Sequence, residues 1–211
     1  MQWWFKHYYS KPRPYNYANI NILIQPGVFP PSFTFSTKIL LDYLSTLDIR
    51  EKTLLELGCG SGIISLLASK KGAHVTASDI NEKALEELKI SALNNSLNLK
   101  IVTSDLFDNI QETHFDYIVI NPPFYPRKPI KIEDNAWYCG DDFEYFQKLF
   151  LQLKAYIENY SNVIMILSED CNIERISSIA HKNDLDLKKF KVSKSLWETN
   201  YLFNVLNLDR K

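Results

Sequence analysis

The sequence predicts an α/β fold: a mostly parallel seven-stranded sheet with helices on both faces and a closing antiparallel pair of strands. Short apolar runs alternate with amphipathic segments through most of the chain, as in sheets whose parallel strands are joined by helices. A glycine-rich stretch directly follows the first strongly apolar run, at residues 58–62. Near the end, the strand-like stretches 187–193 and 201–208 follow each other without a helical pattern, which predicts the antiparallel pair.

Composition narrows the class of protein. The chain has 211 residues, 45% of them hydrophobic and 23% charged, as in ordinary globular proteins. Its net charge of −1 gives no global positive field toward nucleic acid or an acidic membrane. Three scattered cysteines predict reduced thiols and a cytoplasmic location, and four histidines lie too far apart to suggest a metal site. No apolar run reaches the length of a membrane span.

Residues 1–35 differ from the rest and are expected to form an arm and a Pro-rich loop ahead of one larger domain, 36–211. Prolines at positions 12 and 14 disfavour a long helix in the arm, and a short strand is expected at 21–24. Its mixed aromatic and cationic side chains suit either stacking on a nucleic acid strand or packing as a lid on the main domain. They are Trp3, Trp4, Phe5, Lys6, His7, Tyr8, Tyr9, Lys11, Arg13, Tyr15 and Tyr17.

The larger domain begins with an expected helix whose N-cap is Ser36. The following apolar strand runs through Glu56 into the glycine turn, and a helix then ends near Gly72. Further along, the hydrophobic periodicity predicts alternating strands and helices. These are strands at 74–80, 100–104, 115–120 and 162–167, and helices at 82–94, 143–157 and around 173–180.

The glycine turn is the strongest local signal for a ligand. Glycine accepts positive φ and lets a ligand approach bare backbone, and the amides of a following helix favour an anionic or polar group. The dinucleotide fingerprint needs a third glycine where this chain has Ile63, which disfavours an NAD-linked oxidoreductase. We therefore expect a nucleotide-like cofactor at this turn, of another type.

Four polar or glycine positions are expected to meet at one edge of the sheet, because each directly follows a predicted strand and the carboxyl ends of parallel strands share an edge. An acid about 20 residues after the glycine turn commonly binds a ribose. Asp79 stands there, but it could instead cap the next helix, a role that Asn81 could also fill. The four positions are Gly58, Asp79, Asp105 and Asn121.

Two motifs resemble one enzyme class. Glu56 followed by glycines at 58, 60 and 62 is similar to the cofactor loop of class I S-adenosylmethionine-dependent methyltransferases. The tetrapeptide 121–124, Asn-Pro-Pro-Phe, resembles the N-P-P-[YFW] motif of members that methylate a nitrogen conjugated to a π system. The resemblance covers about residues 36–170 and implies a Rossmann-like catalytic domain that uses S-adenosylmethionine without a metal.

The resemblance also implies roles for single residues. The glycine loop would hold the methionine moiety, Asp79 the ribose hydroxyls and Asp105 the adenine amino group, while Ile80 and Leu106 would sandwich the adenine ring. The implied cofactor residues are Glu56, Gly58, Cys59, Gly60, Gly62, Asp79, Ile80, Asp105, Leu106 and Asn121.

For catalysis, the resemblance implies that the Asn121 side-chain oxygen and the Pro122 carbonyl accept hydrogen bonds from the target NH2 group. Pro123 fixes the backbone, and Phe124 would stack on the planar target. Held in this way, the nitrogen lone pair points at the methyl group, and such positioning can supply as much as roughly 7–11 kcal/mol of rate acceleration. No strong base is required.

The acceptor stays open between protein glutamine, as in release factors, and an exocyclic amine of an RNA or DNA base. Residues 136–143 resemble a segment of the release-factor glutamine methyltransferases of the HemK type, but the acidic segment that this type carries before its first helix is missing. Phe124 is also more usual in the base-modifying enzymes. Arg127, Lys128 and Lys131 form either a local basic cluster or a solvated loop.

An alternative function is an inactive, cofactor-binding partner subunit of another methyltransferase. The intact tetrapeptide 121–124 argues against it, since an inactive copy has no physical reason to keep that geometry. The sequence leaves the oligomeric state undetermined.

Overall fold

The computed structural model describes residues 10–31, 35–111, 114–195 and 198–209. Its main element is a seven-stranded sheet of order β5-β4-β3-β6-β7-β9-β8, in which β9 runs antiparallel to both neighbours and the remaining pairs are parallel. This confirms the predicted fold class. The sheet strands are β3 (Thr53–Leu57), β4 (His74–Asp79), β5 (Lys100–Thr103), β6 (Tyr117–Ile120), β7 (Asn162–Ser168), β8 (Leu185–Lys194) and β9 (Thr199–Asn207).

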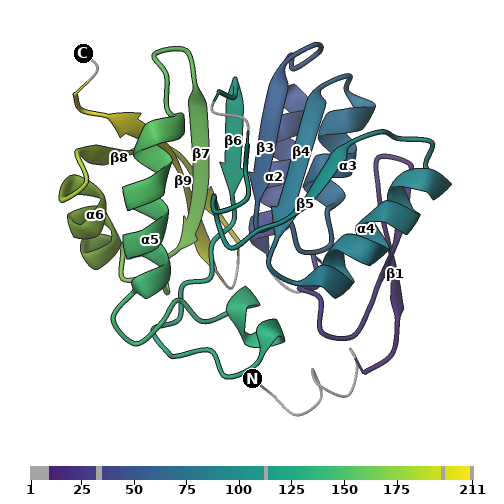
Figure 1. Cartoon of the computed structure of the whole chain (residues 1–211), viewed down its shortest axis with the longest axis horizontal. Coiled ribbons are helices and arrows are strands. Elements are labelled where there is room, and N and C mark those ends of the chain that lie inside the picture. Colours follow the sequence, from purple (N-terminus) through teal and green to yellow (C-terminus); the bar gives the residue numbers. More distant parts are fainter. Residues whose placement is uncertain (1–9, 32–34, 112–113, 196–197, 210–211) are drawn as a thin grey trace.

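Helices cover both faces of the sheet, because each central strand is apolar on both sides. Leu54 of β3 packs into one core with α2, α3 and α4, while the adjacent Leu55 packs into a second core with α5 and α6. Figure 1 shows α5 and α6 side by side over the β7–β9 part of the sheet. The helices are α2 (Phe35–Thr46), α3 (Ile63–Lys70), α4 (Glu82–Asn94), α5 (Glu144–Leu153) and α6 (Ile173–His181), with short 3-10 turns η1 (Ile132–Ala136) and η2 (Lys154–Tyr156).

A small hairpin precedes the main sheet. β1 (Arg13–Tyr17) pairs with β2 (Ile20–Ile24), and both turn residues, Ala18 and Asn19, have positive φ. Positive φ at both central positions is the geometry that suits a two-residue hairpin. Only β2 was expected, because the turn lacks the glycine that usually signals such a hairpin.

Within the described part of the arm, the rings pack on the main domain. Tyr15 and Tyr17 lie against the core that holds α2 to α4, and the Tyr17 hydroxyl donates to Asp42 at 2.8 Å. The alternative of a packed arm therefore holds for these two side chains. The aromatic and basic residues at positions 3–9 lie outside the described residues, as does Trp197.

Two sequence-based helix limits were wrong. Ser36 is not the N-cap of α2: it lies inside the helix, because the helix begins at Phe35, whose amide hydrogen-bonds the Glu198 carboxylate from a distant loop. The helix expected over 143–157 is shorter, since Phe143 adopts left-handed backbone (φ 62°) and the last turn becomes η2. Neither the contact between Phe35 and Glu198 nor the left-handed backbone at Phe143 can be predicted from the local sequence pattern.

Candidate active site

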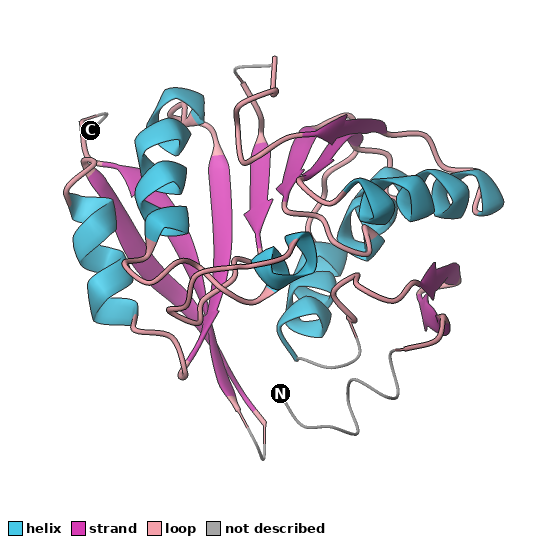
Figure 2. Cartoon of the chain, turned by 60° about the horizontal axis from the view of Figure 1, so that its bottom comes forward, coloured by secondary structure: helices cyan, strands magenta, loops and turns pink. Residues whose placement is uncertain are grey.

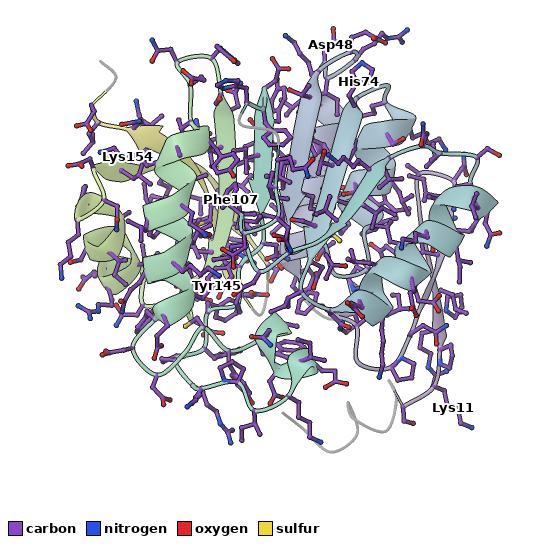
Figure 3. All side chains as sticks on the ribbon, viewed as in Figure 1. Lys11, Asp48, His74, Phe107, Tyr145 and Lys154 are labelled. Carbon is purple, nitrogen blue, oxygen red and sulfur yellow. The ribbon has the colours of Figure 1, made fainter. Side chains whose placement is uncertain are left out.

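A single pocket at the carboxyl ends of β3, β4 and β6 gathers the predicted site residues. In Figure 3, Tyr145 lies near these carboxyl ends of the strands, whereas Asp48 and His74 lie near the opposite ends of the strands. Of the predicted site residues, only Gly62 does not line the pocket. Those that do are Glu56, Gly58, Cys59, Gly60, Asp79, Ile80, Asp105, Leu106, Asn121, Pro122, Pro123 and Phe124.

Asp79 joins the loops that follow β3 and β4. Its carboxylate accepts hydrogen bonds from the Gly60 amide at 2.7 Å and from the Asn81 amide at 2.8 Å. Asn81 caps α4 by accepting from the Lys83 amide, so the cap alternative for Asp79 is excluded. Burial raises the pKa of the Asp79 carboxyl, although both amides favour its charged form.

The glycines of the loop have different tasks. Gly58 has φ +71° and a Cβ there would meet nothing within 4 Å, so bare backbone faces the pocket at this position. Gly62 has φ +69° and precedes α3, and a Cβ there would lie 2.4 Å from a Leu88 methyl group. Gly62 is therefore required for the packing of α4 against the loop.

We predict that Gly62→Ala destabilises the protein more than Gly58→Ala. Both changes place alanine at positive φ, which costs about 1–2 kcal/mol, but only the first also overpacks Leu88, at about 1–3 kcal/mol more. Urea unfolding without cofactor measures the two losses. Equal losses would show that α4 yields to the added methyl group without cost.

Glu56 braces β3 against α3. Its buried carboxyl accepts a hydrogen bond from the Ser65 amide at 2.8 Å and a second, short one from the Ser65 hydroxyl. Burial raises the pKa of Glu56 to about 8, because these two bonds compensate only part of the desolvation of its charge. The carboxyl is thus neutral through most of the physiological range in the folded protein.

This raised pKa predicts that folding stability falls as pH rises from about 4.5 to about 8. In that window the unfolded state ionises Glu56 while the folded state still holds the proton, so the slope reaches about 1.4 kcal/mol per pH unit. Unfolding midpoints of Glu56→Gln should depend less on pH than those of the wild type. Parallel pH profiles of the two proteins would contradict the assignment.

A lysine of α5 anchors the loop that follows β5. Asp105 forms an ion pair with Lys148 at 2.6 Å, and the same ammonium reaches Asp108 at 2.7 Å. The next residue, Leu106, has φ +54° and is buried in the pocket wall, with its carbonyl bound by the Ser104 hydroxyl. The sequence did not indicate Lys148 as the partner of Asp105.

The tetrapeptide 121–124 forms the other wall. The Asn121 side-chain nitrogen lies 3.4 Å from the Ser36 hydroxyl and 3.5 Å from the Thr37 hydroxyl, both buried in the first turn of α2. Pro122 and Pro123 are buried, whereas Phe124 is half-buried. An amide whose nitrogen binds these hydroxyls keeps its oxygen for another donor.

Several pocket residues were missed by the sequence reasoning. Phe29 and Trp137 line the pocket and pack against each other with ring centroids 4.8 Å apart, and Tyr145 lines it from α5. Phe29 stood in the Pro-rich loop and Trp137 in a segment compared only with one enzyme type, so neither carried a local signal for the pocket. Ser36 was considered only as a helix N-cap, and Thr37 was not singled out.

The described ranges contain no group of three or more side chains that could hold a metal ion. The same part of the chain has no helix long and apolar enough to cross a membrane. Of the basic side chains beyond Phe124, Arg127 lies over the Tyr138 ring at 5.2 Å and Lys131 is the N-cap of η1, and the charges of both act on Asp134.

A mostly parallel sheet of this order, a glycine loop after its β3 strand and an Asn-Pro-Pro-Phe turn after β6 define a class I S-adenosylmethionine-dependent methyltransferase. The family model "Methyltransferase small domain" matches residues 19–137, more than half of the chain. The chain belongs to this family.

Two curated relatives whose names give different acceptors are similar to this chain in sequence. A Methanocaldococcus jannaschii protein, provisionally named a protein N5-glutamine methyltransferase, is 32% identical over 162 residues, 74% of this chain and 79% of its own. Ribosomal RNA small subunit methyltransferase C of Actinobacillus pleuropneumoniae is 37% identical over 116 residues, which are 54% of this chain but only 35% of that protein.

Among solved structures, a T. thermophilus 16S rRNA methyltransferase in complex with AdoMet and guanosine has a TM-score of 0.64 and 17% identity. The likeness covers 92% of this chain and 50% of that one. This chain therefore spans about half the length of that enzyme, and the likeness shows a shared fold.

Proposed function

We propose that this protein transfers a methyl group from S-adenosylmethionine to the nitrogen of a planar amide or of an exocyclic base amine. The observation that carries the proposal is the position of the Asn121 amide, which lines the glycine-loop pocket with its nitrogen within 3.5 Å of two α2 hydroxyls. The names of the relatives, a glutamine N5 enzyme and a ribosomal RNA enzyme, agree with an acceptor of this kind.

The residues of the pocket fit the cofactor. Exposed backbone at Gly58 leaves room that any side chain would fill, and the Asp79 carboxylate suits ribose hydroxyls or a cationic group. Ile80 and Leu106 offer apolar walls to a purine ring. When bound, S-adenosylmethionine supplies an electrophilic methyl group on a positively charged sulfur.

The chain's own residues would orient the acceptor. The Asn121 oxygen and the Pro122 carbonyl accept the two N–H bonds of the target, which turns its nitrogen lone pair toward the methyl group. Both acceptors carry partial negative charge and stabilise the positive charge that develops on nitrogen. As the N–C bond forms, the bond between the methyl group and sulfur breaks and leaves a neutral thioether; the nitrogen, still hydrogen-bonded to these two oxygens, then loses one proton to water. Phe124 stacks on the planar acceptor.

We predict that Thr37→Val lowers kcat about 10-fold, because the isosteric side chain no longer accepts a bond from the Asn121 amide, a loss of about 1–1.5 kcal/mol. The affinity for S-adenosylmethionine should stay unchanged. Thr37→Ser restores the hydroxyl and should restore kcat. If valine and serine behave alike, the hydroxyl does not orient Asn121.

Calorimetric titration with S-adenosylmethionine and, separately, with NAD tests the proposed cofactor use. We expect binding of the first only, and binding of NAD alone would refute the proposal. A protein that binds S-adenosylmethionine but never transfers its methyl group to any acceptor would be the inactive partner subunit. The three cysteines are free and buried, which fits the cytoplasmic location we propose.

A further inference from the structure

The edge strand β8 carries an unusual surface. Its sequence from 187 to 195 is Leu-Lys-Lys-Phe-Lys-Val-Ser-Lys-Ser, with four lysines and no acid, in a chain whose net charge is −1. All four lysines are exposed, and none forms an ion pair with another described residue. The lysines are Lys188, Lys189, Lys191 and Lys194.

Aromatic rings lie directly among these lysines. On the α2 side of β8, Lys191 lies over the Tyr43 ring at 5.7 Å; on the opposite side, which α5 and α6 cover, Lys189 lies over the Tyr201 ring at 5.0 Å. Phe190 contacts Tyr43 at 5.2 Å between centroids but remains 38% exposed. Cations interleaved with partly exposed rings are the combination that binds single-stranded nucleic acid, by neutralising phosphates and stacking bases.

The surface leads toward the pocket. Lys194 pairs with Thr199 and Ser193 with Asn200, which in turn pairs with Ser168 at the carboxyl end of β7. β7 neighbours β6, which ends at Asn121. Figure 2 shows the long hairpin of β8 and β9 extending past the other strands, at the carboxyl ends of the parallel strands.

Lysines also protect free sheet edges from pairing with another chain, and β8 is an edge strand. That role accounts for the charges but not for the exposed rings and apolar side chains, since Val192 is 45% exposed between lysines. Two acids near this strand have other partners: Asp42 pairs with Lys38 and accepts from Tyr17, although its charge also acts on Lys191, and Asp186 pairs with His181.

We propose that the α2 side of β8, where Lys188, Phe190 and Lys191 lie beside Tyr43, docks a single-stranded segment of RNA and leads one of its bases to the pocket. The inference rests on the proposed function and narrows its acceptor to a base amine in RNA. Unpaired RNA loops present such amines on splayed-out bases, so no duplex has to be opened. The lysines bind phosphates, and Phe190 stacks on a base.

The test uses the full chain and a fluorescein-labelled, unstructured RNA of about 20 nucleotides, with anisotropy measured over a range of salt concentrations. Each phosphate contact contributes about 0.7 to the salt slope for a single strand. The double variant Lys188→Gln/Lys191→Gln should therefore lower the slope by about 1.4 and weaken binding at low salt about 10-fold or more. Lys89→Gln/Lys182→Gln, two exposed lysines elsewhere, is the matched control and should match the wild type.

A second pair of variants tests stacking. Phe190→Ala should weaken RNA binding about 5- to 100-fold without changing the salt slope. Leu206→Ala, an exposed apolar residue of β9, should have no effect. If the lysine variant self-associates while its RNA affinity and slope equal those of the control, the lysines only protect the edge and the inference is overturned. Absence of RNA binding by the wild type overturns it too.

Failure of this inference is distinguishable from failure of the proposed function. The same proteins are titrated with S-adenosylmethionine. No residue of β8 lines the pocket proposed to bind it. Lack of cofactor binding by the wild type would refute the proposed function. Cofactor binding and methyl transfer to a glutamine-bearing protein, unaffected by the lysine changes, would refute RNA docking alone.

Discussion

Asn121→Ala should lower kcat about 10²- to 10³-fold, the loss expected when a preorganised hydrogen-bonding group is removed from the reacting centre. The affinity for S-adenosylmethionine should change little, because the glycine loop and Asp79 remain. The Asn121 amide is held by Ser36 and Thr37, so the substitution removes an oriented acceptor and leaves the fold in place. Single-turnover transfer and calorimetric titration on the same samples separate the two effects.

Asn183→Ala is the matched control for this experiment. Asn183 lies beyond the last turn of α6 and donates to the Ile179 carbonyl, outside the residues that line the pocket. It should leave kcat unaltered. Normal turnover by Asn121→Ala would show that the mechanism proposed here is wrong, whichever acceptor is used.

The second large effect is expected at the cofactor. Asp79→Asn should weaken S-adenosylmethionine binding about 10- to 100-fold, since hydrogen bonds to a charged group contribute about 1.5–3 kcal/mol. The change keeps the shape of the side chain, but its amide nitrogen cannot accept the bond that one of the Gly60 and Asn81 amides now donates. The loops after β3 and β4 should therefore also become less stable.

Asp48→Asn serves as the control, because Asp48 is exposed near the other ends of the strands, away from the pocket (Figure 3). Calorimetry and thermal unfolding with and without S-adenosylmethionine report affinity and stability. An unchanged affinity in Asp79→Asn would mean that the cofactor does not use this carboxylate, and the assignment by resemblance would have to move to another residue.

The sequence was sufficient wherever local periodicity decides the structure. The apolar strand before Gly58 and the helical face of 82–94 lie where they were predicted, because both follow from the spacing of apolar residues. Asp79 and Asn121 were brought to one pocket for a topological reason: both follow parallel strands of one sheet.

Contacts between distant segments could not be predicted. The contact of Asn121 with Ser36 and Thr37 depends on how α2 packs against the sheet, and the Asp105–Lys148 ion pair depends on the placement of α5. No local pattern encodes either arrangement. The left-handed Phe143 at the start of α5 is similar, since packing in the core of α5 and α6 overrides its local preference.

The most direct test of the central claim follows the methyl group itself. Purified protein is incubated with methyl-tritiated S-adenosylmethionine and extract from cells that lack it, and the label is then traced through nuclease and protease digestion to a chemical product. We predict a nitrogen-methylated product, a nucleoside if RNA is the acceptor, and its loss with Asn121→Ala. Label on carbon or oxygen, or equal labelling by Asn121→Ala, would contradict the account.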